Sequence, residues 1–189
     1  MDQELIKEIN KKEKTALVIW DVQKALVAGI FNKDKFLANT KKLIDSAHKN
    51  RIPVFFTKIT PLPERFESAP RKFLSKRRKM KLSPDGLGFA IAPDAKDIVI
   101  PKNTASIFVG TSFELMVRNA GITTLVFTGI ATEYGIESSG RDALNRGFYS
   151  VIATDAVSSR SEEGHDRSLK NMENLLVLMT TDQILEIWR

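Results

Sequence analysis

Short apolar runs alternate with longer stretches of helical periodicity along most of the chain. The runs are continuously apolar rather than alternating, which is typical of strands in a parallel sheet that is covered on both faces. They predict six strands, at Ala16–Asp21, Pro53–Thr57, Asp97–Pro101, Thr124–Thr128, Ser150–Thr154 and Leu175–Thr180. The stretches between them predict helices at Asp34–Asn50, Ser112–Ala120, Thr132–Arg146, Glu162–Asn174 and Thr181–Trp188.

This alternation predicts an α/β fold, a Rossmann-like three-layer arrangement in which a six-stranded parallel sheet is flanked by helices. Gly121 and Gly147 stand where a helix hands over to a strand, and we expect both to end their helices in a left-handed conformation. Ligands of such open sheets bind outside the carboxyl ends of the strands. Functional residues are therefore expected directly after the strands.

The stretch from Lys58 to Pro93 departs from this rhythm. It contains five of the seven prolines and no strand-like run. Its middle, Pro70–Met80, predicts a short basic helix. A connection of this length inside a compact domain is typical of a lid or a binding insertion. We therefore expect residues 58–93 to form a basic lid or insertion within one domain that spans residues 1–189.

The net charge of +6 is concentrated in this same stretch. Residues 58–81 hold nine Lys and Arg side chains and two Glu, whereas the remaining 20 basic and 21 acidic residues nearly balance. The segment could bind an anionic substrate, contact a partner or be a solvated loop. Aromatic side chains are sparse there and no nucleic-acid motif is present, which argues against a nucleic-acid surface.

The composition excludes several classes of protein and of chemistry. With 189 residues, 42% of them hydrophobic, the chain can build one full core and is neither disordered nor fibrous. It has no cysteine, which excludes disulfides, thiolate metal sites and a cysteine nucleophile. No apolar run approaches the roughly 20 residues that span a bilayer, and the first 14 residues lack a secretory signal pattern. The expected compartment is the cytoplasm.

Three places at the predicted carboxyl edge carry candidate chemistry. Asp21 ends the first strand, and Lys102 follows the third strand and its proline. The fourth strand leads through residues 129–135 into a helix whose first turn presents free backbone N–H groups, an arrangement suited to anions. A helix-capping Asp and a solvent-exposed Lys are the structural alternatives for the two charged residues.

Several segments together resemble the isochorismatase-like hydrolase superfamily, which includes nicotinamidases and N-carbamoylsarcosine amidases. In order along the chain they are Val99–Thr111, Gly121–Thr132, Ser139–Ala143 and Thr154–Ala156. The resemblance implies that Asp21 is an acid/base, that Lys102 is its cationic partner and that the peptide between Ile130 and Ala131 is cis. It also implies that the protein forms a homodimer or homotetramer.

The chain departs from this family pattern at one position. Most members carry a nucleophilic cysteine three residues after the Thr that corresponds to Thr132, and this chain has Gly135 there. Isochorismatases proper also have glycine at that place, and their reaction needs no covalent intermediate. The resemblance therefore implies Asp-centred acid catalysis on a small anionic substrate, with hydrolysis of the vinyl ether of isochorismate as the best candidate. A catalytically inactive binding or interaction protein is the alternative.

The expected site follows from this resemblance and from the basic lid. We expect catalytic positions at Asp21, Lys102 and Gly135. We expect substrate contacts from Gln23, Ile130, Ala131, Tyr134, Arg71 and Arg77.

Serine catalysis and metal binding are weaker alternatives. Ser138 and Ser139 share a helical face with Gly135 but have no evident histidine base in the motif, so packing is their expected role. The exit of the second strand lacks the Asp and His ligands of nicotinamidases. His48 and His165 are isolated in the sequence. We therefore expect no metal and no cofactor.

Overall fold

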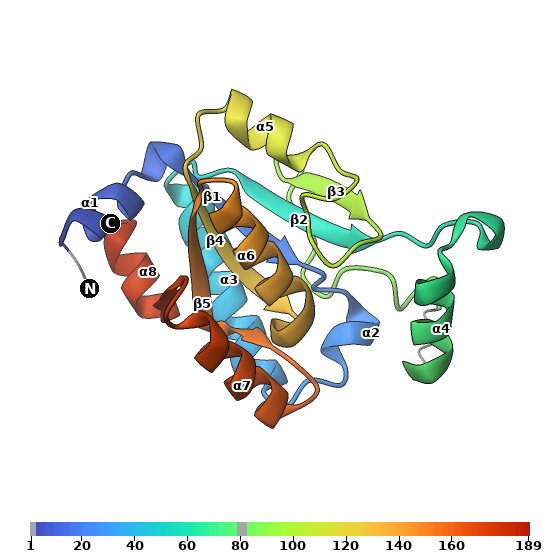
Figure 1. Cartoon of the computed structure of the whole chain (residues 1–189). Helices are drawn as coiled ribbons and strands as arrows, with labels where there is room; N and C mark the ends of the chain where they lie inside the picture. Colours follow the sequence, from blue (N-terminus) through green and yellow to red (C-terminus); the bar gives the residue numbers. More distant parts are fainter. Residues whose placement is uncertain (1–2, 79–82) are drawn as a thin grey trace.

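A single parallel sheet of six strands organises the molecule (Figure 1). The computed structural model describes residues 3–78 and 83–189. The strand order is β3-β2-β1-β4-β5-β6, and every neighbouring pair is parallel. The strands are β1 (Thr15–Trp20), β2 (Val54–Ile59), β3 (Ile98–Lys102), β4 (Thr124–Ile130), β5 (Tyr149–Ser158) and β6 (Val177–Met179). The predicted α/β fold is confirmed.

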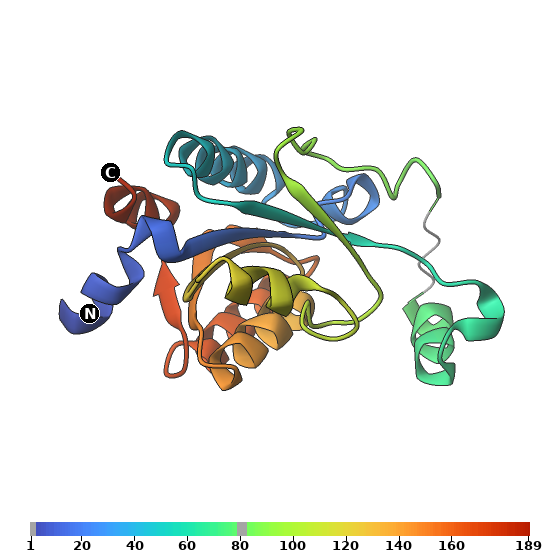
Figure 2. The ribbon, with the colours of Figure 1, turned by 90° about the horizontal axis from the view of Figure 1, so that it is seen from above.

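Helices cover both faces of the sheet (Figure 2). One face packs against α1 (Gln3–Ile9), α3 (Lys33–Lys49) and α8 (Thr181–Ile187). The other packs against α5 (Phe113–Asn119), α6 (Glu137–Asn145) and α7 (Glu162–Met172). Side chains of a strand alternate between faces, so Leu17 and Ile19 of β1 join the first core, whereas Val18 and Trp20 join the second.

The strand limits differ from the sequence prediction chiefly in β5. The apolar run ends before Asp155, but the strand continues to Ser158. The Asp155 carboxylate accepts hydrogen bonds from the backbone N–H and the hydroxyl of Thr181, at 2.7 and 2.8 Å, and from the Asn39 amide at 3.0 Å. Because α3 and α8 supply these partners, a charged residue is accommodated inside a strand.

The helix predicted from Thr132 to Arg146 is divided. A π-helical turn, η3 (Thr132–Ile136), comes first and α6 follows it. Both predicted helix-ending glycines are confirmed, because φ is +68° at Gly121 and +81° at Gly147. None of the helices in the described residues is long and apolar enough to cross a membrane.

The stretch after β2 begins as an arm, and its later part, residues 86–90, returns to bind the backbone that follows Asp21. It contains the short turn η2 (Glu64–Phe66) and α4 (Ala69–Arg78), so the predicted basic helix is present to residue 78. Residues 79–82 lie outside the described part. Both views show α4 standing away from the sheet, beyond the carboxyl ends of β1 and β2 (Figures 1 and 2). A further short helix, α2 (Lys24–Val27), follows β1.

The close approach of β1 and β4 generates a stability prediction at Gly129. Its φ is +130°, and a Cβ atom there would lie 2.1 Å from the Trp20 carbonyl oxygen. We expect Gly129→Ala to lower the free energy of unfolding by about 3 kcal/mol or more, because backbone cannot yield as a side chain does. Gly121→Ala is the matched control, since its left-handed residue faces open space and should cost only about 1 kcal/mol. Urea denaturation measures both, and equal losses would contradict the steric explanation.

Candidate active site

Three adjacent strands bring Asp21, Thr57 and Lys102 together at the carboxyl edge of the sheet. Lys102 Nζ lies 2.6 Å from Asp21 Oδ2. The Thr57 hydroxyl donates to Asp21 Oδ1 at 2.6 Å and accepts the backbone N–H of Asp21 at 2.9 Å. Asp21 has a φ of +49°, a conformation that Asp adopts more readily than most residues. Both carboxylate oxygens are thus held in a fixed orientation.

The ion pair is buried, and burial dominates its electrostatics. The side chains of Asp21 and Lys102 are 5% and 3% exposed. Burial raises the pKa of the Asp21 carboxyl above its ordinary value, while Lys102, Thr57 and the more distant Arg71 oppose the rise. Burial lowers the pKa of the Lys102 ammonium, and Asp21 opposes that change. Both shifts favour uncharged forms, which suits a group that must hold and release a proton.

Trp20 extends this cluster toward β4. It precedes Asp21 on β1, is 1% exposed, and its ring centroid lies 4.0 Å from Lys102 Nζ. The indole also lies against Gly135 of η3, where a Cβ atom would come within 1.8 Å of Trp20 Nε1. The expected catalytic positions Asp21, Lys102 and Gly135 are therefore connected, with Trp20 between the ion pair and the glycine.

The other expected site residues differ in what they contact. The peptide between Ile130 and Ala131 is cis, as the resemblance implied, and Ile130 is buried. Tyr134 is 48% exposed at the edge of this region. Gln23 instead binds backbone: its amide donates to the Leu87 carbonyl at 2.7 Å and accepts from the Ile59 N–H at 3.0 Å. Gln23 thereby joins the end of β2 to the loop before β3.

The two candidate lid arginines have different outcomes. Arg71 lies on α4, its Nε atom is 3.5 Å from the Glu67 carboxylate, and its charge acts on both Asp21 and Lys102. The substrate contact expected of Arg71 stays a prediction. The side chain of Arg77 lies outside the described residues. Its expected substrate contact stays a prediction.

Sequence reasoning overlooked Thr57 and Trp20. Thr57 was visible only as the polar end of an apolar run. It is 36 residues from Asp21 in sequence, and only the pairing of β2 with β1 places its hydroxyl beside the carboxylate. The signal for Trp20 was weaker. A glycine at the start of a helix indicates that some bulky group needs its space, but nothing local identifies that group.

The serine and histidine side chains take structural positions. Ser139 Oγ accepts the Ile107 N–H at 3.3 Å and donates to the Ala105 carbonyl at 3.4 Å. His48 binds Asp97 at 2.7 Å, and His165 binds the Thr132 hydroxyl at 2.8 Å. Across residues 3–78 and 83–189, no three His, Asp or Glu side chains come together in a way that could hold a metal ion.

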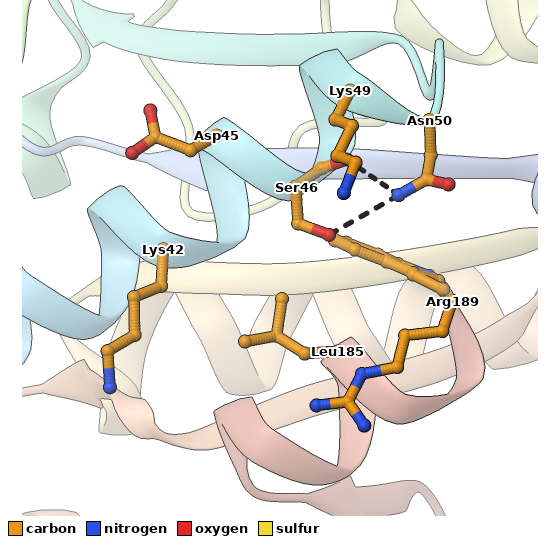
Figure 3. A pocket seen from close by; sticks show the side chains of 8 residues that line it. Lys42, Asp45, Ser46, Lys49, Asn50, Leu185 and Arg189 are labelled. Atoms are coloured by element: carbon orange, nitrogen blue, oxygen red, sulfur yellow. Dashed lines mark hydrogen bonds between the residues drawn. The ribbon is translucent and has the colours of Figure 1, made fainter.

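A pocket of about 570 Å³ lies elsewhere on the molecule. The ends of α3 and α8 form it, with Lys42, Ser46, Lys49, Leu185 and Arg189 among its lining residues (Figure 3). Because α3 ends where β2 is about to begin, this pocket belongs to the edge of the sheet opposite Asp21. Its position separates it from the acid/base cluster.

The fold and the cluster define a class of protein: an open parallel α/β enzyme with a buried carboxylate–ammonium pair at the carboxyl edge of the sheet. Asp21 of this pair follows β1, next to the point where the strand order reverses between β1 and β4. Comparison with known proteins agrees. The Isochorismatase domain model matches residues 15–183. The chain therefore belongs to the isochorismatase family of hydrolases.

Individual relatives span nearly the whole chain. The isochorismatase family protein YwoC of Bacillus subtilis is 31% identical over 184 residues, covering 92% of this chain and 94% of YwoC. The ureidoacrylate amidohydrolase RutB of Pseudomonas syringae is 30% identical over 192 residues, covering 86% of this chain and 78% of RutB. A cysteine hydrolase structure from Pseudomonas syringae pv. phaseolicola has a TM-score of 0.85 at 16% identity, covering 94% and 93% of the two chains. At that identity, the likeness shows the fold alone.

The buried ion pair generates a prediction about stability. Either Asp21→Asn or Lys102→Met leaves one buried charge without its partner, and we expect each to cost about 3–5 kcal/mol of unfolding free energy. The double variant should cost clearly less than the sum of the two. The exposed pair Lys41–Asp45, at 3.0 Å on α3, is the control and should couple by less than about 1 kcal/mol. Additive losses at Asp21 and Lys102 in urea denaturation would show that the pair is not coupled.

Proposed function

We propose that this protein hydrolyses the vinyl ether of isochorismate by acid catalysis, without a covalent intermediate. The observation that carries the proposal is the buried Asp21 carboxyl with a raised pKa, set beside a position 135 that has no side chain. A protonated carboxyl supplies the acid, and no nucleophile is needed. Glycine at position 135 also accords with the pattern of isochorismatases proper described above.

The chemistry follows from one proton held at Asp21. The carboxyl gives its proton to the terminal methylene carbon of the enolpyruvyl group, leaving an oxocarbenium-like carbon. Water adds to that carbon and returns a proton to the Asp21 carboxylate, and the resulting hemiketal breaks into pyruvate and the ring alcohol. Lys102 stabilises the carboxylate while its proton is away. We expect Arg71, whose charge acts on the pKa of Asp21, to attract the substrate carboxylates.

Amide hydrolysis is the activity that the name of the RutB relative would suggest. Thiol-based amide hydrolysis needs a cysteine, and this chain has none. Neither the Ser139 hydroxyl nor the Thr132 hydroxyl lies in the Asp21 cluster in the described contacts. The proposed substrate class therefore rests on the candidate acid Asp21 and not on the names of the relatives.

A non-catalytic binding protein is the second candidate. The observation in its favour is the nearly complete burial of Asp21, Lys102 and Trp20, which leaves little of the cluster accessible. Against it stands the arrangement itself, since a buried ion pair seldom adds stability over apolar side chains. Assays of substrate turnover and ligand binding distinguish the two candidates.

The direct test measures pyruvate release from isochorismate beside ammonia release from ureidoacrylate, nicotinamide and N-carbamoylsarcosine. We expect turnover of isochorismate only, and we expect Asp21→Asn to reduce kcat by about 10²–10⁴-fold or more, because the proton donor is lost. Circular dichroism establishes that the variant is folded. Efficient amide hydrolysis would contradict the proposal, and tight ligand binding without any turnover would favour the binding protein.

The pH dependence gives a second test. Acid catalysis needs protonated Asp21, so kcat/KM should fall as pH rises through the pKa of this group, and burial places that fall above the ordinary carboxyl range. The Arg71 charge favours the ionised carboxylate, so Arg71→Gln should move the fall to higher pH and raise KM for the dianionic substrate. Lys72→Gln, on the same helix, is the matched control. A downward shift in Arg71→Gln would contradict the assigned electrostatics.

A further inference from the structure

The space beside Gly135 is already filled, and Trp20 fills it. A Cβ atom on Gly135 would lie 1.8 Å from Trp20 Nε1, 2.1 Å from Cε2 and 2.6 Å from Cζ2. Real Cβ atoms essentially never approach another heavy atom within 3.0 Å. Any side chain at this position, nucleophilic or not, therefore requires the indole to move.

The surroundings restrict that movement. The backbone of Trp20 pairs with Gly129 of β4, where even a Cβ atom would lie 2.7 Å from the Trp20 nitrogen. The indole is almost fully buried in the core beneath α5 and α6, and Lys102 Nζ stands over its ring. Neither a shift of the strand nor a free rotation of the ring is available without disturbing these contacts.

We propose that Trp20 is the specificity-determining residue that closes this site to covalent catalysis, and that Trp20 and Gly135 form one reciprocal pair. The indole occupies the volume in which a nucleophile at position 135 would stand. The absence of a nucleophile at Gly135 is therefore only half of the explanation. Even if a side chain were introduced at this position, Trp20 would block the space that it needs. The inference deepens the proposed function and rests on it only in taking Asp21 and Lys102 as the reacting pair.

The reciprocal pair has a thermodynamic signature. Gly135→Ala adds a single methyl group and should lower the melting temperature of the wild type by about 4–10 °C, the range expected for an overpacked core in a chain of this length. In a Trp20→Leu background the same change should be nearly neutral. Trp20→Phe is the second background, since it keeps a ring beneath Lys102 while removing Nε1, the atom nearest the added methyl. It should relieve the clash in part.

An introduced thiol provides a chemical test of this space, because the cysteine-free chain has no other thiol that could react. In the double variant Trp20→Leu/Gly135→Cys, the new thiol faces the space that the indole vacates, beside Lys102. We expect the neighbouring Lys102 side chain, where it carries its charge, to favour the reactive thiolate. Reaction with iodoacetamide then forms a sulfur–carbon bond and breaks the carbon–iodine bond, releasing iodide and passing the thiol proton to solvent.

The expected rates separate the variants. At pH 6.5 the double variant should react at least about 10-fold faster than Leu115→Cys, an ordinary thiol on the exposed face of α5. Gly135→Cys alone should melt well below the wild type. The proposal is overturned if Gly135→Ala leaves the wild-type melting temperature unchanged, or if Gly135→Cys alone folds normally and reacts as fast as the double variant.

These outcomes are independent of isochorismate turnover. If the melting temperatures and the thiol rates behave as expected but no pyruvate is released, the exclusion by Trp20 holds and the proposed function fails. If pyruvate is released but Gly135→Ala is neutral in the wild type, the proposed function holds and the role of Trp20 fails. Trp20→Phe/Gly135→Cys serves as the thiol variant where Trp20→Leu does not fold.

Discussion

The contact on which the site depends is the buried pair between the Asp21 carboxylate and the Lys102 ammonium. Removing two charges from water is costly, and attraction offsets that cost only where geometry and further hydrogen bonds are good. Here the nitrogen–oxygen distance is 2.6 Å, and Thr57 binds the second carboxylate oxygen. The three residues come from neighbouring strands, so the sheet itself supplies the geometry. The same burial that makes the ion pair costly in free energy also raises the pKa of the Asp21 carboxyl, toward the range useful for a catalytic acid.

A steric constraint runs beside this electrostatic one. β1 and β4 approach so closely that Gly129 tolerates no Cβ atom against the Trp20 backbone, and Gly135 tolerates none against the Trp20 indole. Two glycines, separated by the cis peptide at Ile130, thus accommodate one tryptophan. Trp20 packs in the second core and directly precedes Asp21, the residue proposed above as the acid. The packing of Trp20 and the chemistry proposed for Asp21 therefore both depend on the carboxyl end of β1.

The arm after β2 adds charge from a distance. Its helix α4 stands away from the sheet, yet the charge of Arg71 influences both members of the ion pair (Figure 1). Gln23 anchors the neighbouring chain by binding the end of β2 and the Leu87 carbonyl. The ion pair is therefore held at the edge of the sheet and lies within the electrostatic influence of the basic arm. That combination is consistent with the small anionic substrate proposed above.

The sequence by itself determined the strand and helix rhythm, the carboxyl-edge placement of Asp21 and Lys102, and the absence of a thiol nucleophile. Hydrophobic periodicity is local, and a missing residue type needs no structure to be noticed. The length of β5 could not be predicted from the sequence, because Asp155 is accommodated in the strand by hydrogen bonds from Asn39 and Thr181. Only the tertiary structure placed Thr57 on the carboxylate, bound Gln23 to backbone and set Trp20 against Gly135. Each of these contacts joins segments distant in sequence, so its geometry exists only after the strands have paired.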